Sequence, residues 1–351
     1  MSVQLLIGTD KGAFLCRSDG ARRNWKIEGP YYKGWKVTAA ERSADGGWLL
    51  GTASHVYGAA IHAGRDVTNL RQVGGTPRYA ESLKRPLTEV WRIVAAKDGA
   101  CYAGVMEAGL FRSTDGGESW APVDGLNEHP SRGKWQPGNG GLCAHSILTD
   151  PKNSRRIWCG ISAVGVWRSD DGGDRWQACN SGVPHALEDK DFPEIGFCVH
   201  ALQSDPAAPE RIWRQDHLGM FRSTDAGASW ERIESGLPSR FGFPLARSRS
   251  DGALYAVPLE SDEYRFPKDG RLSVYRSRND GQSWEAADRG LPRDCYASVL
   301  RGAMDTDGMN PCGVYFGTTA GDVFVSTDGG DSWAALPVRL PRVMCVRAVA
   351  V

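Results

Sequence analysis

A ten-residue phrase recurs five times along the chain and constrains the fold more than any other feature. It begins with an aromatic residue, ends with tryptophan, and places serine, an aspartate or asparagine, and glycine between them at fixed steps. The closing tryptophans are separated by 56, 54, 54 and 49 residues. A period of about 50 residues indicates an array of similar supersecondary units. The five copies end at Trp120, Trp176, Trp230, Trp284 and Trp333.

Two more units extend the array to seven. A degenerate copy of the phrase keeps the seven-residue step from Ser18 to Trp25 but lacks the aspartate and glycine at their usual positions. The 95 residues from Trp25 to Trp120 have room for two units, so one unit, roughly residues 35–75, carries no phrase. From Trp25 to Trp333 the chain covers 308 residues, which corresponds to six steps and therefore to seven units.

Each unit reads as four short strands. In residues 140–183, apolar runs at 142–148, 156–161 and 165–168 are separated by Gly, Pro and Asp turns, and a fourth run follows Trp176. Four strands repeated seven times predict an all-β fold with one seven-bladed β-propeller. The expected blades of this single domain, residues 1–351, are 343–351 with 1–30, then 35–75, 89–126, 140–183, 197–237, 242–291 and 296–340.

The two ends of the chain are expected to share a blade. Residues 343–351 resemble a first strand with nothing after it, and residues 3–27 resemble the remaining three strands with nothing before them. Pairing of the two ends would remove the free sheet edges that an open array leaves.

The recurring phrase is expected to have a structural role. Its aspartate can accept hydrogen bonds from the backbone N–H groups of its own turn, and its glycine can adopt the positive φ that closes the turn. Its tryptophan can then anchor the turn to the sheet. The D-x-D-x-D-G spacing of an EF-hand calcium loop is absent. The phrase therefore predicts the fold and not an activity.

The five copies resemble the Asp-box, or BNR, repeat of sialidases, of two-propeller xyloglucanases and related glycosyl-hydrolase-like proteins, of sortilin-type receptors and of a photosystem II assembly factor. The resemblance covers nearly the whole chain. It implies that the repeated turn lies between the third and fourth strands, and that ligands bind at the opposite end of each blade. That end carries the loops entering each first strand and the hairpins between second and third strands. The Arg-Ile-Pro motif and six-blade count of classical sialidases are absent.

Composition excludes several classes of protein. The 42 basic and 42 acidic residues balance, so no excess charge is available to neutralise nucleic-acid phosphates. No apolar run approaches the ~18 residues of a membrane span. The first eight residues read as a strand and not as a leader, so we expect a cytoplasmic, intracellular protein. The nine cysteines lack C-x-x-C spacing and are expected to be reduced and buried.

Basic or imidazole side chains occupy one apparent position in six of the seven first strands, the exception being the sixth blade near Leu245. If they converge, they suit the carboxylate or phosphate of a small anionic or carbohydrate-like ligand, because arginine offers a bidentate fork. Alternatively, each bonds to carbonyl groups of the neighbouring blade. The six residues are Lys36, Arg92, His145, His200, Arg301 and Arg347.

The hairpins at the same end of the blades supply the candidates for chemistry. Glu107 and Asp216, with His217, are the predicted catalytic groups, because carboxylates beside cations suit a base or charge stabiliser. No motif requires a cofactor, but His55, His145, His200 and His217 could together hold a divalent metal. His55 and Trp135 are further predicted ligand contacts, the indole as a platform for a sugar ring. The long entering loops 74–90, 124–144 and 180–196 hold Tyr79, Glu89, His129, Trp135, His185 and Glu194.

Two functions from different classes remain open. The first is an enzyme or binder that holds, and as a glycoside hydrolase or lyase cleaves, a small anionic sugar-derived ligand. A metal-dependent lyase that uses the histidines is a subcase. The second is a non-catalytic propeller that docks a protein partner.

Overall fold

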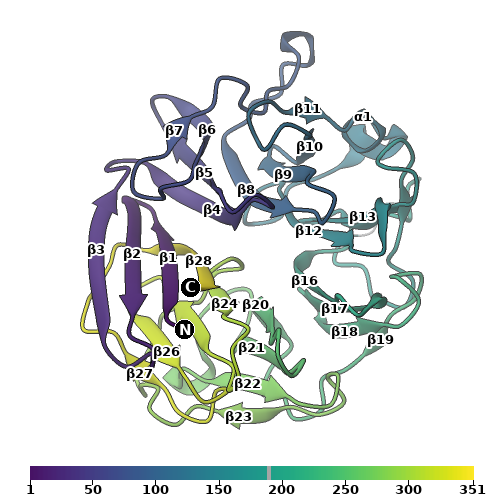
Figure 1. The fold of residues 1–351 in the computed structure, drawn as a ribbon. Coiled ribbons are helices and arrows are strands. Elements are labelled where there is room, and N and C mark those ends of the chain that lie inside the picture. Colours follow the sequence, from purple (N-terminus) through teal and green to yellow (C-terminus); the bar gives the residue numbers. More distant parts are fainter. Residues whose placement is uncertain (188–190) are drawn as a thin grey trace. The chain divides into compact units, whose positions relative to one another are not determined.

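The computed structural model describes residues 1–187 and 191–351 and contains seven four-stranded sheets (Figure 1). It confirms the predicted all-β, seven-bladed β-propeller. Residues 188–190, in the middle of the predicted loop 180–196, lie outside the described residues. Helix in the described chain is limited to α1 (Asp124–Asn127) and three 3-10 turns, and none of these could cross a membrane.

Six sheets follow the chain order of their strands, and the seventh joins both ends of the chain. The strands are β1 (Val3–Thr9), β2 (Gly12–Ser18), β3 (Trp25–Tyr31) and β28 (Val343–Ala350); β4 (Lys36–Arg42), β5 (Trp48–Ser54), β6 (Gly58–Gly64) and β7 (Arg71–Gln72); β8 (Glu89–Ala95), β9 (Cys101–Met106), β10 (Gly109–Ser113) and β11 (Ala121–Pro122); β12 (Ala144–Asp150), β13 (Asn153–Ile161), β14 (Gly165–Ser169) and β15 (Gln177–Ala178); β16 (Val199–Asp205), β17 (Ala208–Asp216), β18 (Gly219–Ser223) and β19 (Glu231–Arg232); β20 (Phe241–Arg247), β21 (Leu254–Leu259), β22 (Val274–Ser277) and β23 (Glu285–Ala287); β24 (Met304–Thr306), β25 (Val314–Gly317), β26 (Val323–Ser326) and β27 (Ala334–Ala335).

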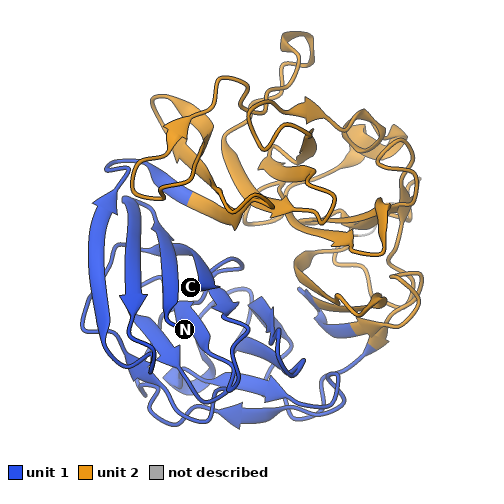
Figure 2. Ribbon diagram, viewed as in Figure 1, with its two compact units in different colours: residues 1–37, 215–221, 232–351 blue, residues 38–214, 222–231 orange. Residues whose placement is uncertain are grey.

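The chain divides into two compact units (Figure 2). Unit 1 comprises residues 1–37, 215–221 and 232–351, and unit 2 comprises residues 38–214 and 222–231. The predicted blade that lacks the repeated phrase, at residues 35–75, forms the four-stranded sheet β4–β7. The predicted blade boundaries stay a prediction.

The sheet that joins the termini lies in unit 1 and is as predicted. Strand β28 pairs antiparallel with β1, from Val3 opposite Ala350 to Thr9 opposite Val343. The last strand of the chain therefore supplies the first strand of this sheet, and the N and C labels lie beside it in Figure 1.

The repeated turn has the hydrogen bonds that its residues predict. In the first copy, Ser113 Oγ donates to Asp115 Oδ1 (2.7 Å) and accepts from Gly117 N (2.9 Å). The hydroxyl and backbone N–H of Ser119 both donate to Asp115 and are the main reasons why its pKa falls to about 2. Asn279 replaces aspartate in the fourth copy and accepts the equivalent backbone bond from Ser283 N (3.0 Å). The hydrogen bonds of the turn are thus made by residues of the turn itself.

The closing tryptophan also fastens consecutive sheets together. Three indole Nε1 atoms donate to the preceding sheet: Trp230 to Cys179 O (2.9 Å), Trp284 to Ile233 O (2.8 Å) and Trp333 to Ala287 O (2.8 Å). The backbone of each tryptophan also contacts a glycine that follows the last strand of the preceding sheet. A Cβ added to this glycine would stand under 3.0 Å from the tryptophan carbonyl oxygen. These glycines are Gly182, Gly236 and Gly290.

We expect Gly290→Ala to destabilise the protein by roughly 2 kcal/mol more than Gly99→Ala. Both glycines have a positive φ (+94° and +91°), so both substitutions carry the same backbone strain. Only at Gly290 does the new methyl group meet the Trp333 backbone, whereas nothing lies within 4 Å at Gly99. Urea unfolding of the two variants measures the difference. Equal losses would show that the sheets can separate at this contact without cost.

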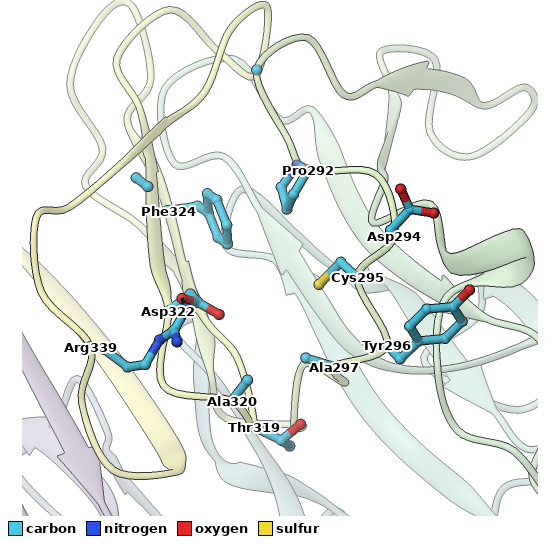
Figure 3. Close-up of a pocket in the computed structure, with 12 residues that line it drawn as sticks. Pro292, Asp294, Cys295, Tyr296, Ala297, Thr319, Ala320, Asp322, Phe324 and Arg339 are labelled. Atoms are coloured by element: carbon cyan, nitrogen blue, oxygen red, sulfur yellow. Dashed lines mark hydrogen bonds and ion pairs between the residues drawn. The ribbon is translucent and has the colours of Figure 1, made fainter.

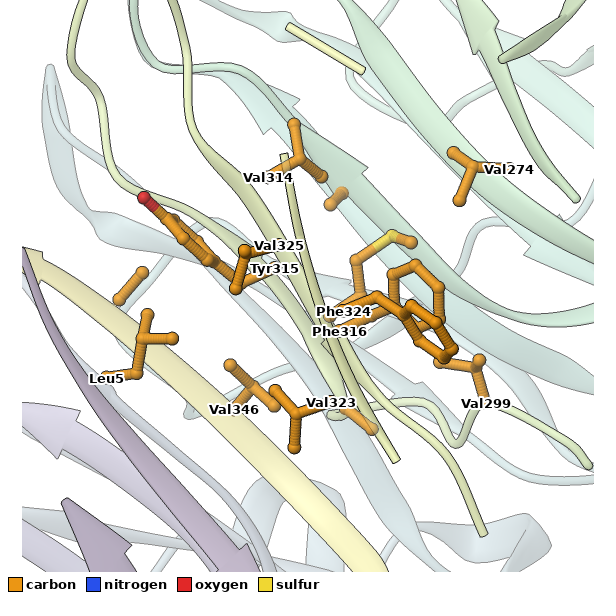
Figure 4. Packing of buried hydrophobic residues seen from close by; sticks show 14 of the residues in the cluster. Leu5, Val274, Val299, Val314, Tyr315, Phe316, Val323, Phe324, Val325 and Val346 are labelled. Atoms are coloured by element: carbon orange, nitrogen blue, oxygen red, sulfur yellow. The ribbon is translucent and has the colours of Figure 1, made fainter. Parts of the chain in front are cut away.

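A hydrophobic cluster fills unit 1 between its sheets (Figure 4). Phe316 and Phe324 stack with ring centroids 5.1 Å apart, and Trp333 packs edge-on against Phe316 at 5.1 Å. Leu5 and Val346, from the two ends of the chain, belong to the same cluster. Closure by the termini therefore buries apolar surface as well as pairing strand edges.

A buried ion pair ties the loop after β2 to the sheet β24–β27. Arg22 Nη1 lies 2.8 Å from Asp307 Oδ2, and the two side chains are 7% and 0% exposed. Burial alone would raise the pKa of Asp307. The hydrogen bonds from Met309 N, Gly313 N, Tyr315 Oη and Arg22 outweigh it, so the pKa is lowered. The carboxylate is consequently held in its charged form.

Asp307→Asn should cost about 3 kcal/mol of unfolding free energy at neutral pH, because it leaves Arg22 buried without its counter-charge. Since the pKa of Asp307 is lower in the folded state, this stabilisation is present above pH ~4 and is lost as the pH falls through the folded value. The gap between wild type and variant should therefore shrink in acid, which denaturation at several pH values measures. As a control, Glu118→Gln breaks the exposed pair with Arg71 and should cost less than about 1 kcal/mol.

Candidate functional site

The first strands of neighbouring sheets are aligned by glycines that allow close approach. Each glycine lies in a second strand and touches a small aliphatic residue in the first strand of the adjoining sheet. A Cβ added to the glycine would lie 3.0 Å or less from that residue. The residue that contacts the glycine therefore marks the equivalent position in each first strand. The pairs are Gly8–Val37, Gly51–Val90, Gly104–Ala144, Gly160–Val199 and Gly317–Val343.

This alignment overturns the predicted common position of the cationic residues. His145 and His200 each follow the aligned residue by one, but Lys36 precedes it by one. Arg92 follows it by two and Arg347 by four. A register shift directly follows the aligned residue in two of these sheets, between Val90 and Arg92 and between Ala144 and Ser146, so the bulge is shared and does not cause the different offsets. The predicted common position paired residues by chemical type alone, whereas the glycine contacts that set the alignment are visible only in the structure.

Several of the predicted cations have partners within their own unit. In unit 1, Arg347 Nη1 lies 3.5 Å from Asp305 Oδ2, and the Arg301 guanidinium lies 4.7 Å from the centre of the Phe243 ring. In unit 2, His145 is buried with Nδ1 3.1 Å from Ser146 Oγ. These contacts fit the alternative in which the cations serve the fold, and their role in ligand binding stays a prediction.

The predicted catalytic residues fall in both units. Asp216, in unit 1, is fully buried, and its Oδ1 accepts the backbone N–H of Leu218 (3.1 Å) in the hairpin after β17. His217, also in unit 1, lies 3.4 Å from Asp262 and packs edge-on against Phe241. Glu107 belongs to unit 2.

The predicted metal-binding histidines divide in the same way. His55 is exposed in the hairpin between β5 and β6, in unit 2. Also in unit 2, His200 is buried with Nε2 3.7 Å from Cys198 Sγ. Within the part of unit 2 that the structure describes, His55, His145 and His200 do not form a three-ligand cluster.

Glu107 lies in a cluster that we call the Glu107 cluster: Tyr79, Arg85, Glu107, Glu128 and Arg132. The long loops before β8 and after β11 bring these residues to the hairpin between β9 and β10. Tyr79 Oη donates to the backbone oxygen of Glu107 (2.6 Å). Burial raises the pKa of Tyr79 despite the nearby charges of Arg132 and Arg85, so the phenol stays protonated at neutral pH.

The two arginines of the Glu107 cluster differ in their partners. Arg85 forms a two-point ion pair with Glu128, at 2.6 and 3.3 Å. The Arg132 side chain forms no hydrogen bond or ion pair with any residue that the structure describes, although its Nε is buried. Burial lowers the pKa of Arg132, and the charge of Arg85 adds to that, while Tyr79 and Glu107 oppose it. A half-buried guanidinium whose donors have no hydrogen-bond partner can donate to an anion.

Trp135 does not offer the open platform that the sequence predicts. Its side chain is 5% exposed, and the Arg132 guanidinium lies 4.7 Å from the centre of its ring. Its Nε1 donates to Ser131 Oγ (3.0 Å), and its ring packs near Trp167. A sugar could stack on Trp135 only if these neighbours moved. In this structure Trp135 instead supports Arg132.

A groove of about 640 Å³ lies in unit 1 beside the hairpin between β25 and β26 (Figure 3). Pro292, Cys295 and Phe324 line it, and Figure 3 shows the Cys295 sulfur pointing toward the side that carries Phe324 and Asp322. Asp322 is paired with Arg339 at 3.2 Å. The volume falls in the range of about 300–1,000 Å³ found for ligand pockets.

Cys295 should be the one thiol that reacts readily in the folded protein. The other eight cysteines are buried, as predicted for all nine, and Cys295 is partly exposed in the groove. We expect iodoacetamide to add one carbamidomethyl group per native chain, at Cys295, and nine after unfolding, as measured by mass spectrometry. Peptide mapping that located the native label at another cysteine would contradict this accessibility.

Sequence reasoning missed Arg132, Arg85 and Glu128, although it identified the loop 124–144 that carries two of them. It also missed the groove around Cys295. The available signal was the length of the loops, since long loops on one end of a scaffold often carry binding residues. Which side chain in such a loop lacks a partner is visible only in three dimensions.

Comparison with known proteins finds similar chains among proteins named xyloglucanases and similar folds in a GH74 enzyme and in YCF48. No family model matches the chain. A xyloglucanase from Paenibacillus sp. is 27% identical over 213 residues, covering 48% of this chain and 19% of its own. The crystal structure of an ancestral GH74 enzyme superposes with a TM-score of 0.60 at 17% identity, over 85% of this chain and 38% of that one. YCF48 bound to D1 peptide gives 0.55 at 16% identity, over 87% and 84%.

The fold is therefore a seven-bladed β-propeller similar to those of GH74 xyloglucanases and YCF48. The chain spans less than a third of the length of the curated xyloglucanases it matches.

Proposed function

We propose that this chain is a carbohydrate-binding propeller that takes an acidic sugar, such as a uronic acid, at the Glu107 cluster. The observation that carries the proposal is Arg132, a half-buried guanidinium without a hydrogen-bond or ion-pair partner among the described residues. The carboxylate of the sugar would supply the missing counter-ion. Arginine suits this role because its fork binds both carboxylate oxygens.

The other groups of the Glu107 cluster suit the hydroxyls of the same ligand. The Glu107 carboxylate has no hydrogen bond or ion pair to other described residues, so it is available to accept from sugar hydroxyls. Tyr79 remains protonated and holds the hairpin through the Glu107 backbone. Similarity to proteins named xyloglucanases supports a sugar over other anions.

Binding is better supported than hydrolysis. Glycoside hydrolases generally use two carboxyl groups across the scissile bond. The Glu107 cluster holds one free carboxylate, Glu107, because Glu128 is occupied by Arg85. Glu107 keeps its predicted role as the acid–base candidate.

Calorimetric titration with glucuronate and with glucose tests the proposal. We expect glucuronate to bind and glucose to bind at least about tenfold more weakly, because one charge-assisted contact contributes ~1.5–3 kcal/mol. Arg132→Met should remove the preference, since it keeps the apolar stem over Trp135 and deletes the charge.

Arg175→Met is the matched control for the titration, because Arg175 is exposed in the turn before Trp176 and lies outside the Glu107 cluster. It should leave the glucuronate affinity unchanged. Equal binding of glucuronate by the wild type and by Arg132→Met would refute this site.

A further inference from the structure

Three aromatic rings in unit 1 form a surface slot next to the groove of Figure 3. Tyr264 and Tyr296 are 54% and 65% exposed, which is unusual for large aromatic side chains. Phe266 is less exposed and contacts both, with ring centroids 5.7 Å from Tyr264 and 5.4 Å from Tyr296. Phe266 is inclined by 32° to the Tyr264 ring and by 80° to the Tyr296 ring, and we call the three rings the aromatic slot. Tyr296 also lines the groove.

The aromatic slot is held in shape by the backbone around it. Cys295 N donates to Gly270 O (2.7 Å), and Ser298 Oγ donates to Arg265 O. These bonds join the loop after β21 to the segment before β24. Gly270 lies against the Tyr296 ring, where an added Cβ would stand 2.8 Å from the ring. Because these contacts hold the aromatic slot in place before a ligand binds, binding costs little conformational entropy of the protein.

The surroundings of the aromatic slot are acidic. Residues 260–269 hold four acidic and two basic side chains. Glu263, Asp269 and Asp294 are exposed and have no ion pair to other described residues. The two bases are Arg265, which lies over the Phe243 ring at 5.7 Å, and Lys268; Arg293 is exposed beside Asp294. With Glu260, which also has no ion pair to described residues, four such carboxylates exceed the three such cations, Arg265, Lys268 and Arg293, and so favour a basic ligand.

We propose that the aromatic slot and its groove bind a proline-rich segment that carries basic side chains. Proline-rich chains adopt the polyproline II helix, whose rings fit between aromatic side chains and whose carbonyls remain free for donors such as tyrosine hydroxyls. The free carboxylates of Glu263, Asp269 and Asp294 would pair with the basic residues. This surface is separate from the Glu107 cluster, and the proposal does not depend on the acidic sugar.

Other ligands fit the geometry less well. A peptide added as a β-strand needs a long free edge, but β27, which borders the groove, has two residues. A sugar ring needs one flat open platform, whereas Phe266 and Tyr296 meet at 80° and form a notch. A notch accepts the edge of a proline ring.

Fluorescence anisotropy with labelled nonapeptides tests the proposal on the full chain. The probe has three Arg-Pro-Pro triplets. One comparison peptide has three Arg-Gly-Ser triplets, with the same charge but no polyproline preference, and another has three Glu-Pro-Pro triplets. We expect the first to bind at least about tenfold more tightly than either of the others.

Substitutions locate the binding. Tyr296→Ala should weaken the Arg-Pro-Pro peptide by about tenfold or more, as for an interface aromatic anchor. Tyr57→Ala removes another exposed tyrosine, in unit 2, and should have no effect. Asp294→Asn should lower the affinity and reduce its salt dependence, and asparagine tolerates the positive φ of 58° at this position. Arg132→Met should leave peptide binding unchanged, which separates this result from the sugar proposal.

Three outcomes would overturn the proposal. The first is equal binding of the Arg-Gly-Ser peptide, which would mean attraction by charge alone. The second is unchanged peptide affinity in a Tyr296→Ala variant whose thermal unfolding matches wild type, and the third is binding of neutral cellohexaose that Tyr296→Ala abolishes. The last result would make the aromatic slot a sugar site.

Discussion

The contact between the closing tryptophan of one sheet and the exit segment of the sheet before it is the constraint on which the fold depends. A four-stranded sheet of this length cannot bury both faces alone, so each sheet must pack on the next. At Gly290 the Trp333 backbone comes closer than any side chain would allow, and the indole then reaches Ala287 O. The glycine, the tryptophan and the turn that presents it therefore recur together.

This constraint also determines where the chain is free to vary. The serine and aspartate of each turn satisfy one another, and the outer strands are two or three residues long in every sheet except the one that ends in β3. The loops entering the first strands are not bound in this way. The longer ones, before β8 and after β11, carry Tyr79 and Arg132, which form the Glu107 cluster on the hairpin they share. Function in such a fold is therefore expected in the connections and not in the repeat.

The fold could be predicted in detail because its signals are local and repeated. The seven units, the sheet without the phrase at 35–75, the shared blade of the two termini and the hydrogen bonds of the turn all follow from spacing and residue type. The site could be predicted only in part. Glu107 was found because it occupies a hairpin, but the common position of Lys36, Arg92 and Arg347 was wrong. The contacts that align neighbouring first strands, such as Gly51 against Val90 and Gly104 against Ala144, join different sheets, and a comparison of residue types could not supply them.

By itself, the sequence determined the architecture: a period near 50 residues, glycine where backbones must touch, and tryptophan where a turn must be anchored. Only the tertiary structure decided which polar groups find partners. Glu128 is neutralised by Arg85 while Arg132 is left without a counter-ion, and Trp135 is covered while Tyr264 and Tyr296 are exposed. Strand pairing is governed by short-range periodicity that the sequence displays. The partner of a loop side chain comes from a distant segment, whose approach depends on the packing of the whole unit.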